Sequence, residues 1–241
     1  ITVGTLALVG VLFTMPQYFQ GVQGFDAMGS GLGLLPLIAG FVVGLAPAAR
    51  LVRLAGAKIT VALGFAVLAA GWFVGATTSL ESSGAFVAAW MAGAGIGFGL
   101  LFATAASAAL SELPVDRSGI GSAVLQALKN TGAPLGAAIL GSVLSSTYQT
   151  DLHPAGLPPA AARAVEGSVF GGLAVASQLH SAALLESVRA AFVHGIDAAL
   201  VVSAGIAIAG MLIAVAFLPG RAAVSGASEP VSGEGRRAAT G

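Results

Sequence analysis

Few side chains in this sequence could carry out proton chemistry. His194 and Asp197 are three residues apart, so they share one face of a predicted helix. Such a pair could handle protons, or it could form an ordinary hydrogen bond at the edge of a membrane. Both interpretations stay open, and the pair is a candidate proton-handling site.

The sequence lacks the arrangements that hydrolases and metalloenzymes use. It has no Gly-x-Ser-x-Gly motif, and His153, His180 and His194 do not have the spacing of metal ligands. It also has no cysteine, which excludes thiolate chemistry within this sequence. We therefore expect no enzyme, no metal and no cofactor.

Polar and aromatic side chains inside apolar segments are the other candidates for function. Amide, aromatic and methionine side chains can bind flat apolar compounds without demanding one geometry. The alternative is packing against lipid, and Tyr18 and Trp90 would also suit an interfacial aromatic belt. The predicted cavity residues are Phe13, Gln17, Tyr18, Trp90, Phe98 and Asn130.

These candidates belong to a chain that is too apolar for a soluble domain. Its 241 residues are 56% hydrophobic and 8% charged, whereas soluble domains carry about 25% charged residues. The apolar runs are continuous rather than alternating, and each is near the roughly 20 residues that a membrane helix needs. We predict an all-α polytopic membrane protein. Its predicted spans are roughly 1–20, 31–49, 59–79, 84–109, 122–147 and 195–218.

Cations mark one side of this arrangement. Eight of the ten Lys and Arg residues lie on one side, and Arg163 and Arg189 are the exceptions. The positive-inside rule makes the cation-rich side cytoplasmic, together with both ends of the chain. The cluster Arg50, Arg53 and Lys58 joins the second and third spans, so we expect it to fix the topology of that hairpin.

Lys129 has two interpretations. If its span begins at Asn130, Lys129 is interfacial and snorkels to the headgroups. If the helix begins near Ile120, Lys129 lies about three turns, or roughly 15 Å, inside. It would then line a polar cavity, because charges inside a membrane are costly.

Segment 149–194 is predicted to be an external helical loop, either a lid or a spacer. We expect one short helix in "LPPAAARAVEGSV" that Gly171-Gly172 ends. A second helix, with Ser181 as its N-cap, would lead into the last span. Residues 221–241 are rich in Ser, Gly, Ala and Pro and are predicted to be a disordered cytoplasmic tail. Residue 1 is Ile inside an apolar run, so we expect the chain to lack its natural N-terminus.

Glycines recur four residues apart within the predicted spans. Such small-xxx-small patterns let helix backbones approach closely in lipid, and glycine faces could also slide during a conformational change. The pairs are Gly40 with Gly44, Gly93 with Gly97, Gly95 with Gly99, and Gly132 with Gly136.

Two long stretches resemble the fourteen-span drug/proton antiporters of the major facilitator superfamily. "SGLGLLPLIAGFVVGLAPAARLVRLAGAK" is similar to their helix with a Leu-Pro pair that runs into a basic loop. "GAGIGFGLLFATAASAALSELPVDRSGIGSAVLQALKNTGAPLGAAILGSV" is similar to their Gly-rich helix, the following loop and the next helix. The resemblance implies the last six spans of such a transporter, arranged as two inverted three-helix repeats. Arg53 departs from the family by standing where an acid or a small residue is expected.

The resemblance also implies a function. It implies a secondary transporter that exports small hydrophobic or cationic drugs through the inner membrane by alternating access, coupled to protons. The partners would be the lipid bilayer, the drug, protons and a missing N-terminal half, and the balanced charge predicts no nucleic acid. The alternative is a non-transporting six-helix remnant or scaffold that dimerises or binds a partner. The implied inner-gate residues are Arg50, Arg53, Lys58, Asp116, Arg117 and Lys129.

Overall fold

The described part of the chain is entirely helical outside its turns. The computed structural model describes residues 2–111, 118–152 and 157–218, and the side chains at 108–111 and at several positions of 118–129 lie outside that description. The helices are α1 (Thr2–Gly21), α2 (Ala27–Gly33), α3 (Leu35–Ala55), α4 (Ala57–Gly75), α5 (Gly84–Ser111), α6 (Ser118–Asp151), α7 (Pro159–Gly167), α8 (Val169–Gln178) and α9 (Ala182–Phe217).

Local chemistry accounts for where these helices begin and end. The Asp26 carboxylate accepts a hydrogen bond from the Gly29 N–H and caps α2. Gly56 separates α3 from α4 with φ 89°, a left-handed conformation that glycine adopts without strain. The predicted span 59–79 overruns α4, which ends at Gly75. Beyond that point the Thr77 and Thr78 hydroxyls donate to carbonyls of the last turn.

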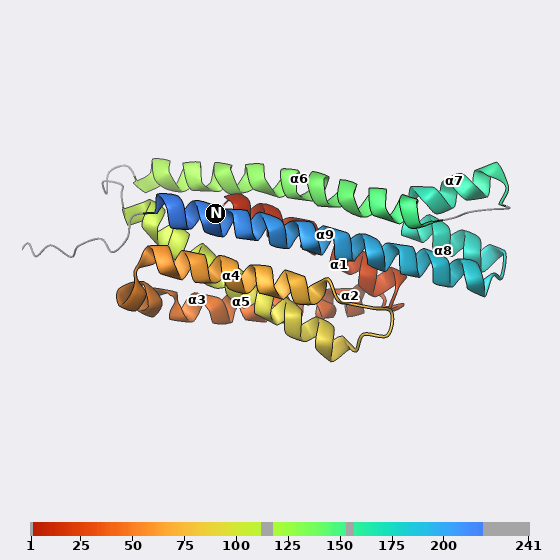
Figure 1. Ribbon diagram of the computed structural model, residues 1–241, viewed down its shortest axis with the longest axis horizontal. Helices are drawn as coiled ribbons and strands as arrows, with labels where there is room; N and C mark the ends of the chain where they lie inside the picture. The colour runs from red at the N-terminus through yellow and green to blue at the C-terminus, as the bar shows by residue number, and fades with distance from the viewer. Residues whose placement is uncertain (1, 112–117, 153–156, 219–241) are drawn as a thin grey trace, which may run out of the picture.

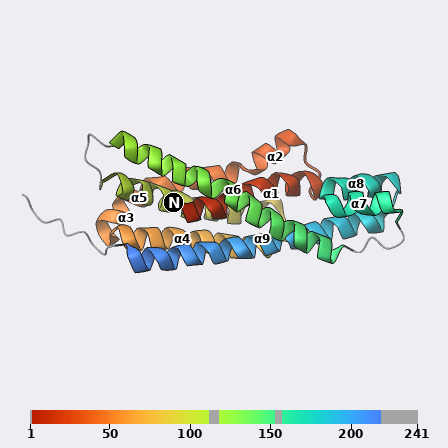
Figure 2. The same cartoon turned by 90° about the horizontal axis from the view of Figure 1, so that it is seen from above.

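The six long helices run back and forth along one axis, so successive ones point in opposite directions (Figures 1 and 2). Helix α1 begins at the same end of the bundle where α3 meets α4 and where α9 finishes. The predicted ranges correspond in order to α1, α3, α4, α5, α6 and α9. Helix α3 packs chiefly on α5, α4 on both α5 and α9, and α6 on α1 and α9.

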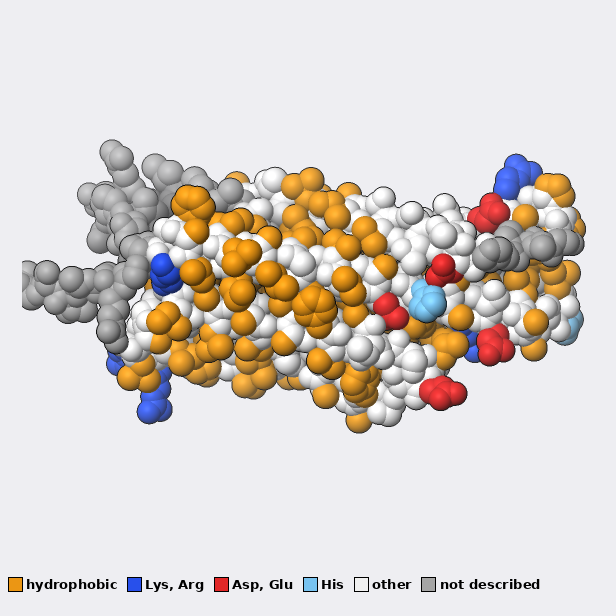
Figure 3. All heavy atoms as spheres, in the orientation of Figure 1, with side chains coloured by type: hydrophobic (Ala, Val, Ile, Leu, Met, Phe, Trp, Pro, Cys, Tyr) orange, Lys and Arg blue, Asp and Glu red, His pale blue; other side chains and the backbone are white. Residues whose placement is uncertain are grey.

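Charge is concentrated at the two ends of the bundle. Figure 3 shows an apolar middle section, with Lys and Arg at one end and acidic, histidine and further Lys or Arg side chains at the other. Helix α6 is 34 residues long. Among the described residues, the segments long and apolar enough to cross a membrane are Thr2–Gly21, Ala27–Ala55, Ala57–Gly75, Gly84–Ser107 and Ala182–Phe217.

Most of the predicted glycine pairs are close approaches between backbones. A Cβ added at Gly40 or Gly44 of α3 would strike the carbonyl oxygens of Ala92 or Ile96 in α5. In return, Gly95 and Gly99 of α5 face carbonyl groups of α3, which confirms the small-xxx-small prediction for both helices. Gly93 is an exception, because nothing lies within 4 Å of its Cβ position.

The segment before the last span folds back onto the bundle. Ser181 caps α9 as predicted, since its hydroxyl accepts from the Leu184 N–H. The prediction that Gly171-Gly172 ends a helix is wrong, because both residues lie inside α8 and the break falls at Ser168. The Ser168 hydroxyl accepts a hydrogen bond from the Gly171 N–H and caps α8. The stabilisation from this N-cap outweighs the low helix propensity of the two glycines.

Candidate functional site

An apolar hollow lies between α1, α3 and α5. Its volume is about 190 Å³. Its walls carry apolar side chains from three helices, with a glycine between them. The lining residues are Leu8, Leu12, Leu37, Ile38, Phe41, Gly95 and Phe98.

Two phenylalanine rings, Phe41 and Phe98, line this hollow, and a third, Phe102, packs against both. The ring centroids of Phe41 and Phe98 are 5.6 Å apart, and Phe102 lies 5.8 Å from Phe41 and 5.9 Å from Phe98. Phe41 belongs to α3 and the other two to α5, so the close glycine contacts between these helices bring the rings together. The spacing falls within the range that aromatic pairs prefer. An apolar ring would therefore meet further aromatic faces here.

The structure separates the six predicted cavity residues rather than gathering them. Phe98 lines the hollow, whereas Phe13 is 60% exposed on the outer surface of α1. Tyr18 and Trp90 are buried, each at most 4% exposed, and Trp90 packs edge-to-face on Trp72.

The two amide residues also lie apart. Gln17 is half-buried, and its side chain donates to the Phe13 carbonyl of the preceding turn. Asn130 is exposed on α6. Neither lines the hollow.

Sequence reasoning missed Phe41, which is central to the hollow. A signal for it was present, because Phe41 directly follows Gly40. A residue next to a small-xxx-small face lies beside the partner helix that packs on that face. Leu8 and Leu12 of α1 had no such signal, since they are two of many leucines in apolar runs.

A polar pocket lies at the acidic end of the bundle, between the α4–α5 connection and α9. Its volume is about 430 Å³. The connection supplies hydroxyls and a carboxylate, and α9 supplies a histidine and a second carboxylate. The polar lining residues are Thr77, Thr78, Ser79, Glu81, His194 and Asp197.

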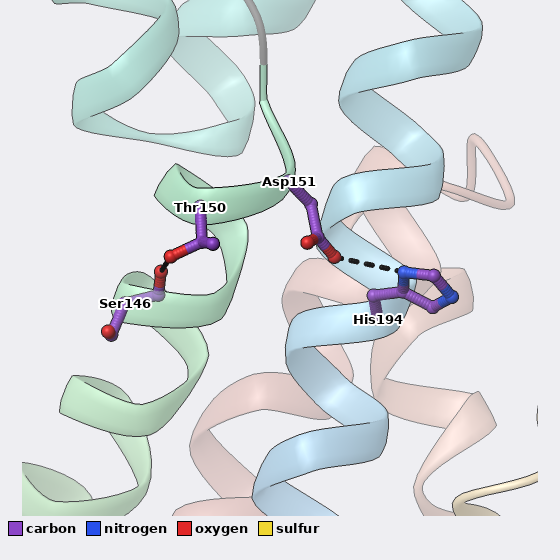
Figure 4. A network of polar contacts seen from close by, with 4 residues as sticks. All are labelled: Ser146, Thr150, Asp151 and His194. Atoms are coloured by element: carbon purple, nitrogen blue, oxygen red, sulfur yellow. Dashed lines mark hydrogen bonds and ion pairs between the residues drawn. The ribbon is translucent and has the colours of Figure 1, made fainter.

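His194 and Asp197 do not pair with each other. The His194 ring Nδ1 lies 2.9 Å from Oδ2 of Asp151, which ends α6 (Figure 4). Among the described residues, Oδ1 of Asp197 is enclosed and has no hydrogen-bond partner. The two predicted proton-handling residues therefore have different environments: His194 joins α6 to α9, and Asp197 lies at the pocket with one oxygen unpaired.

The predicted gate residues lie at the opposite end. Arg50 and Arg53 are exposed in the last turns of α3, and Lys58 is half-buried in the first turn of α4. Helix α6 begins at Ser118, so the backbone of Lys129 is about three turns into the helix. The Lys129 side chain, and Asp116 and Arg117 altogether, lie outside the described residues.

The fold and these sites define a multi-pass α-helical membrane protein. Long apolar helices, an apolar middle section and backbone contacts through glycine are the features of bundles that span a bilayer. Among the described residues, no group of three His, Cys, Asp or Glu side chains could hold a metal ion.

The chain is similar in sequence to bacterial efflux and export proteins, which are not enzymes. It is 30% identical over 218 residues to the multidrug efflux pump LfrA of Mycolicibacterium smegmatis, a match that covers 88% of this chain and 43% of the pump. It is 26% identical over 221 residues to the tetracenomycin C resistance and export protein of Streptomyces glaucescens, covering 87% of this chain and 41% of that protein.

A shorter match is 28% identical over 148 residues to the multidrug resistance protein Stp of Mycobacterium tuberculosis, covering 61% of this chain and 27% of Stp. The chain thus spans less than half the length of the curated relatives it matches. No family model matches the sequence.

Proposed function

We propose that this chain is one half of a proton-coupled drug exporter of the plasma membrane. The observation that carries the proposal is the apolar hollow with its phenylalanine wall, in a chain similar to multidrug efflux pumps. A hollow of this composition suits the aromatic or aliphatic part of a small hydrophobic or cationic drug. A second half would complete the cavity, since the matched pumps are more than twice as long as the matched region.

The packing supports an arrangement of two inverted three-helix repeats, α1–α3–α4 and α5–α6–α9. In this arrangement α1 corresponds to α5, α3 to α6 and α4 to α9. The α3–α5 contact of one repeat pair therefore corresponds to the α6–α1 contact. In both contacts, two glycines four residues apart approach two carbonyls four residues apart. The corresponding contacts are Gly40 on Ala92, Gly44 on Ile96, Gly132 on Thr2 and Gly136 on Leu6.

Proton coupling is the finer part of the proposal. Asp197 lies on a helix that is long enough to span the membrane, and it lines a pocket together with Glu81 and His194. A carboxylate with an enclosed, unpaired oxygen is costly while charged, so protonation would relieve that cost. We propose that Asp197 takes up a proton from the outer side and that drug export accompanies its passage inward.

Transport and binding measurements test these roles. Replacing Phe41 with Ala should weaken binding of radiolabelled tetraphenylphosphonium, a cation with four phenyl rings, by about 5- to 10-fold, because about 1 kcal/mol of apolar contact is lost. Phe73→Ala is the matched control, since Phe73 is an exposed α4 ring away from the hollow. Equal binding by wild type and Phe41→Ala would refute the hollow as the drug site.

To test the proton role of Asp197, the chain is joined to a compatible N-terminal half and expressed in a pump-deficient host. Asp197→Asn should abolish the dependence of efflux on the pH gradient while tetraphenylphosphonium binding persists. Unchanged coupling would exclude Asp197 as the proton carrier. Efflux by the 241-residue chain alone would refute the need for a second half. Self-association with no drug binding would instead favour the scaffold.

A further inference from the structure

The close contacts through glycine divide the long helices into two groups. In the described residues, backbone contacts join α3 with α5, α4 with α5, α1 with α6, and α6 with α9. The first two contacts form one group, α3–α4–α5, and the last two form the other, α1–α6–α9. Glycine contacts that cross from one group to the other meet side chains and no backbone: Gly4 meets Leu101, Gly75 meets Leu200, and Gly210 meets Phe65. Side chains also meet glycines inside the groups, as Leu140 does at Gly10, but there backbone contacts accompany them.

This difference has mechanical consequences. Two backbones in contact have no rotamers to change, so a sliding helix would carry residues larger than glycine onto the facing carbonyl groups. Side chains such as Leu101, Leu200 and Phe65 can move between rotamers, and packed helices slide past each other through such changes. The α4–α9 and α1–α5 contacts should therefore yield before the contacts inside each group.

Polar contacts follow the same division. Arg189 of α9 donates to the carbonyl of Gly21, the last residue of α1, over 3.2 Å. His194 of α9 bonds Asp151 of α6. Both bonds lie inside the α1–α6–α9 group and strengthen it as a unit.

We propose that the two groups are rigid bodies and that the boundary between them is a shear plane. The hollow straddles this boundary, because Leu8 and Leu12 come from one group and Phe41 and Phe98 from the other. Sliding along the boundary would widen or close the hollow. The chain would thus change the shape of its own drug site, and this consequence rests on the proposed function. The shear plane itself does not depend on that function.

Distances between spin labels test the shear plane in the 241-residue chain. The chain has no cysteine, so pairs of introduced cysteines can be labelled without background. Three pairs of exposed positions share labelled sites and are measured in lipid nanodiscs with and without tetraphenylphosphonium. They are Ala70 with Ala89 inside the first group, Val201 with Ala138 inside the second, and Ala70 with Val201 across the boundary.

The distance distribution of the pair across the boundary should be about 1–2 Å broader than that of either internal pair, or its mean distance should change by about 1–2 Å when tetraphenylphosphonium is added. Shared sites control for label mobility, since Ala70 and Val201 each occur in an internal pair. Equal widths for the three pairs, or greater breadth in an internal pair, would overturn the shear plane. A broad boundary pair without binding of the probe would refute the hollow as the drug site and leave the shear plane standing.

Discussion

At the scale of single residues, burial decides which side chains can meet a substrate. Tyr18 and Trp90 have the chemistry of drug-site residues, yet they fill the interior of the bundle. Phe41 was not singled out by type or spacing, and it forms the centre of the phenylalanine wall. The indole N–H groups of Trp72 and Trp90 are enclosed, and the described residues supply no hydrogen-bond partner for either.

Tyr148 provides a residue-scale prediction. Its hydroxyl is buried and donates to the Val165 carbonyl over 2.8 Å, which joins α6 to α7. Tyr148→Phe should lower the free energy of unfolding by about 1–3 kcal/mol, since a buried carbonyl loses its partner. The measurement is thermal denaturation, together with the rate of proteolysis in segment 157–168.

The matched control is Thr150→Val. The Thr150 hydroxyl donates only to the Ser146 carbonyl of its own helix, at an exposed position (Figure 4). Its loss should change stability little. If both variants unfold alike, the Tyr148 bond does not hold the segment.

At the scale of helices, glycine spacing sets which pairs touch. The α3–α5 contact is reciprocal, with glycines on both helices facing carbonyls of the other. The segment that contains α7 and α8 is continuous with the bundle core, because Val165 and Val169 are buried with Tyr148 and Phe192. This packing favours the spacer over the lid among the two interpretations of that segment.

Gly44 provides the prediction at this scale. Gly44→Ala should destabilise the bundle by about 1–3 kcal/mol, because the new Cβ meets the Ile96 carbonyl and the helices must separate. Gly141→Ala is the control, since nothing lies within 4 Å of that position and alanine favours a helix. Thermal unfolding in detergent should order the proteins Gly141→Ala, wild type, Gly44→Ala, and an inverted order would contradict the contact.

At the scale of the whole molecule, charge and length determine how the bundle lies in a membrane. The cation cluster at the corner between α3 and α4 and the polar pocket beside α9 lie at opposite ends of the bundle (Figure 3). From the positive-inside rule we predict that the cation-rich end faces the cytoplasm.

Reporter fusions test this orientation. An alkaline phosphatase fused after Gly220 should be inactive, and one inserted between Asp151 and Glu166 should be active, because that enzyme folds only outside the cytoplasm. A green fluorescent protein at the same sites should give the reverse pattern. Signals opposite to these would refute the proposed topology.

The sequence by itself determined the membrane class, the order of the long helices and the Ser181 cap that begins the last of them. These features depend on composition and on neighbours a few residues apart, as for Ser181. Only the tertiary structure decided which faces are buried, because lipid and protein interior are both apolar and hydrophobic periodicity cannot distinguish them. It likewise decided that His194 pairs with Asp151, 43 residues away, rather than with Asp197, three residues along its own helix.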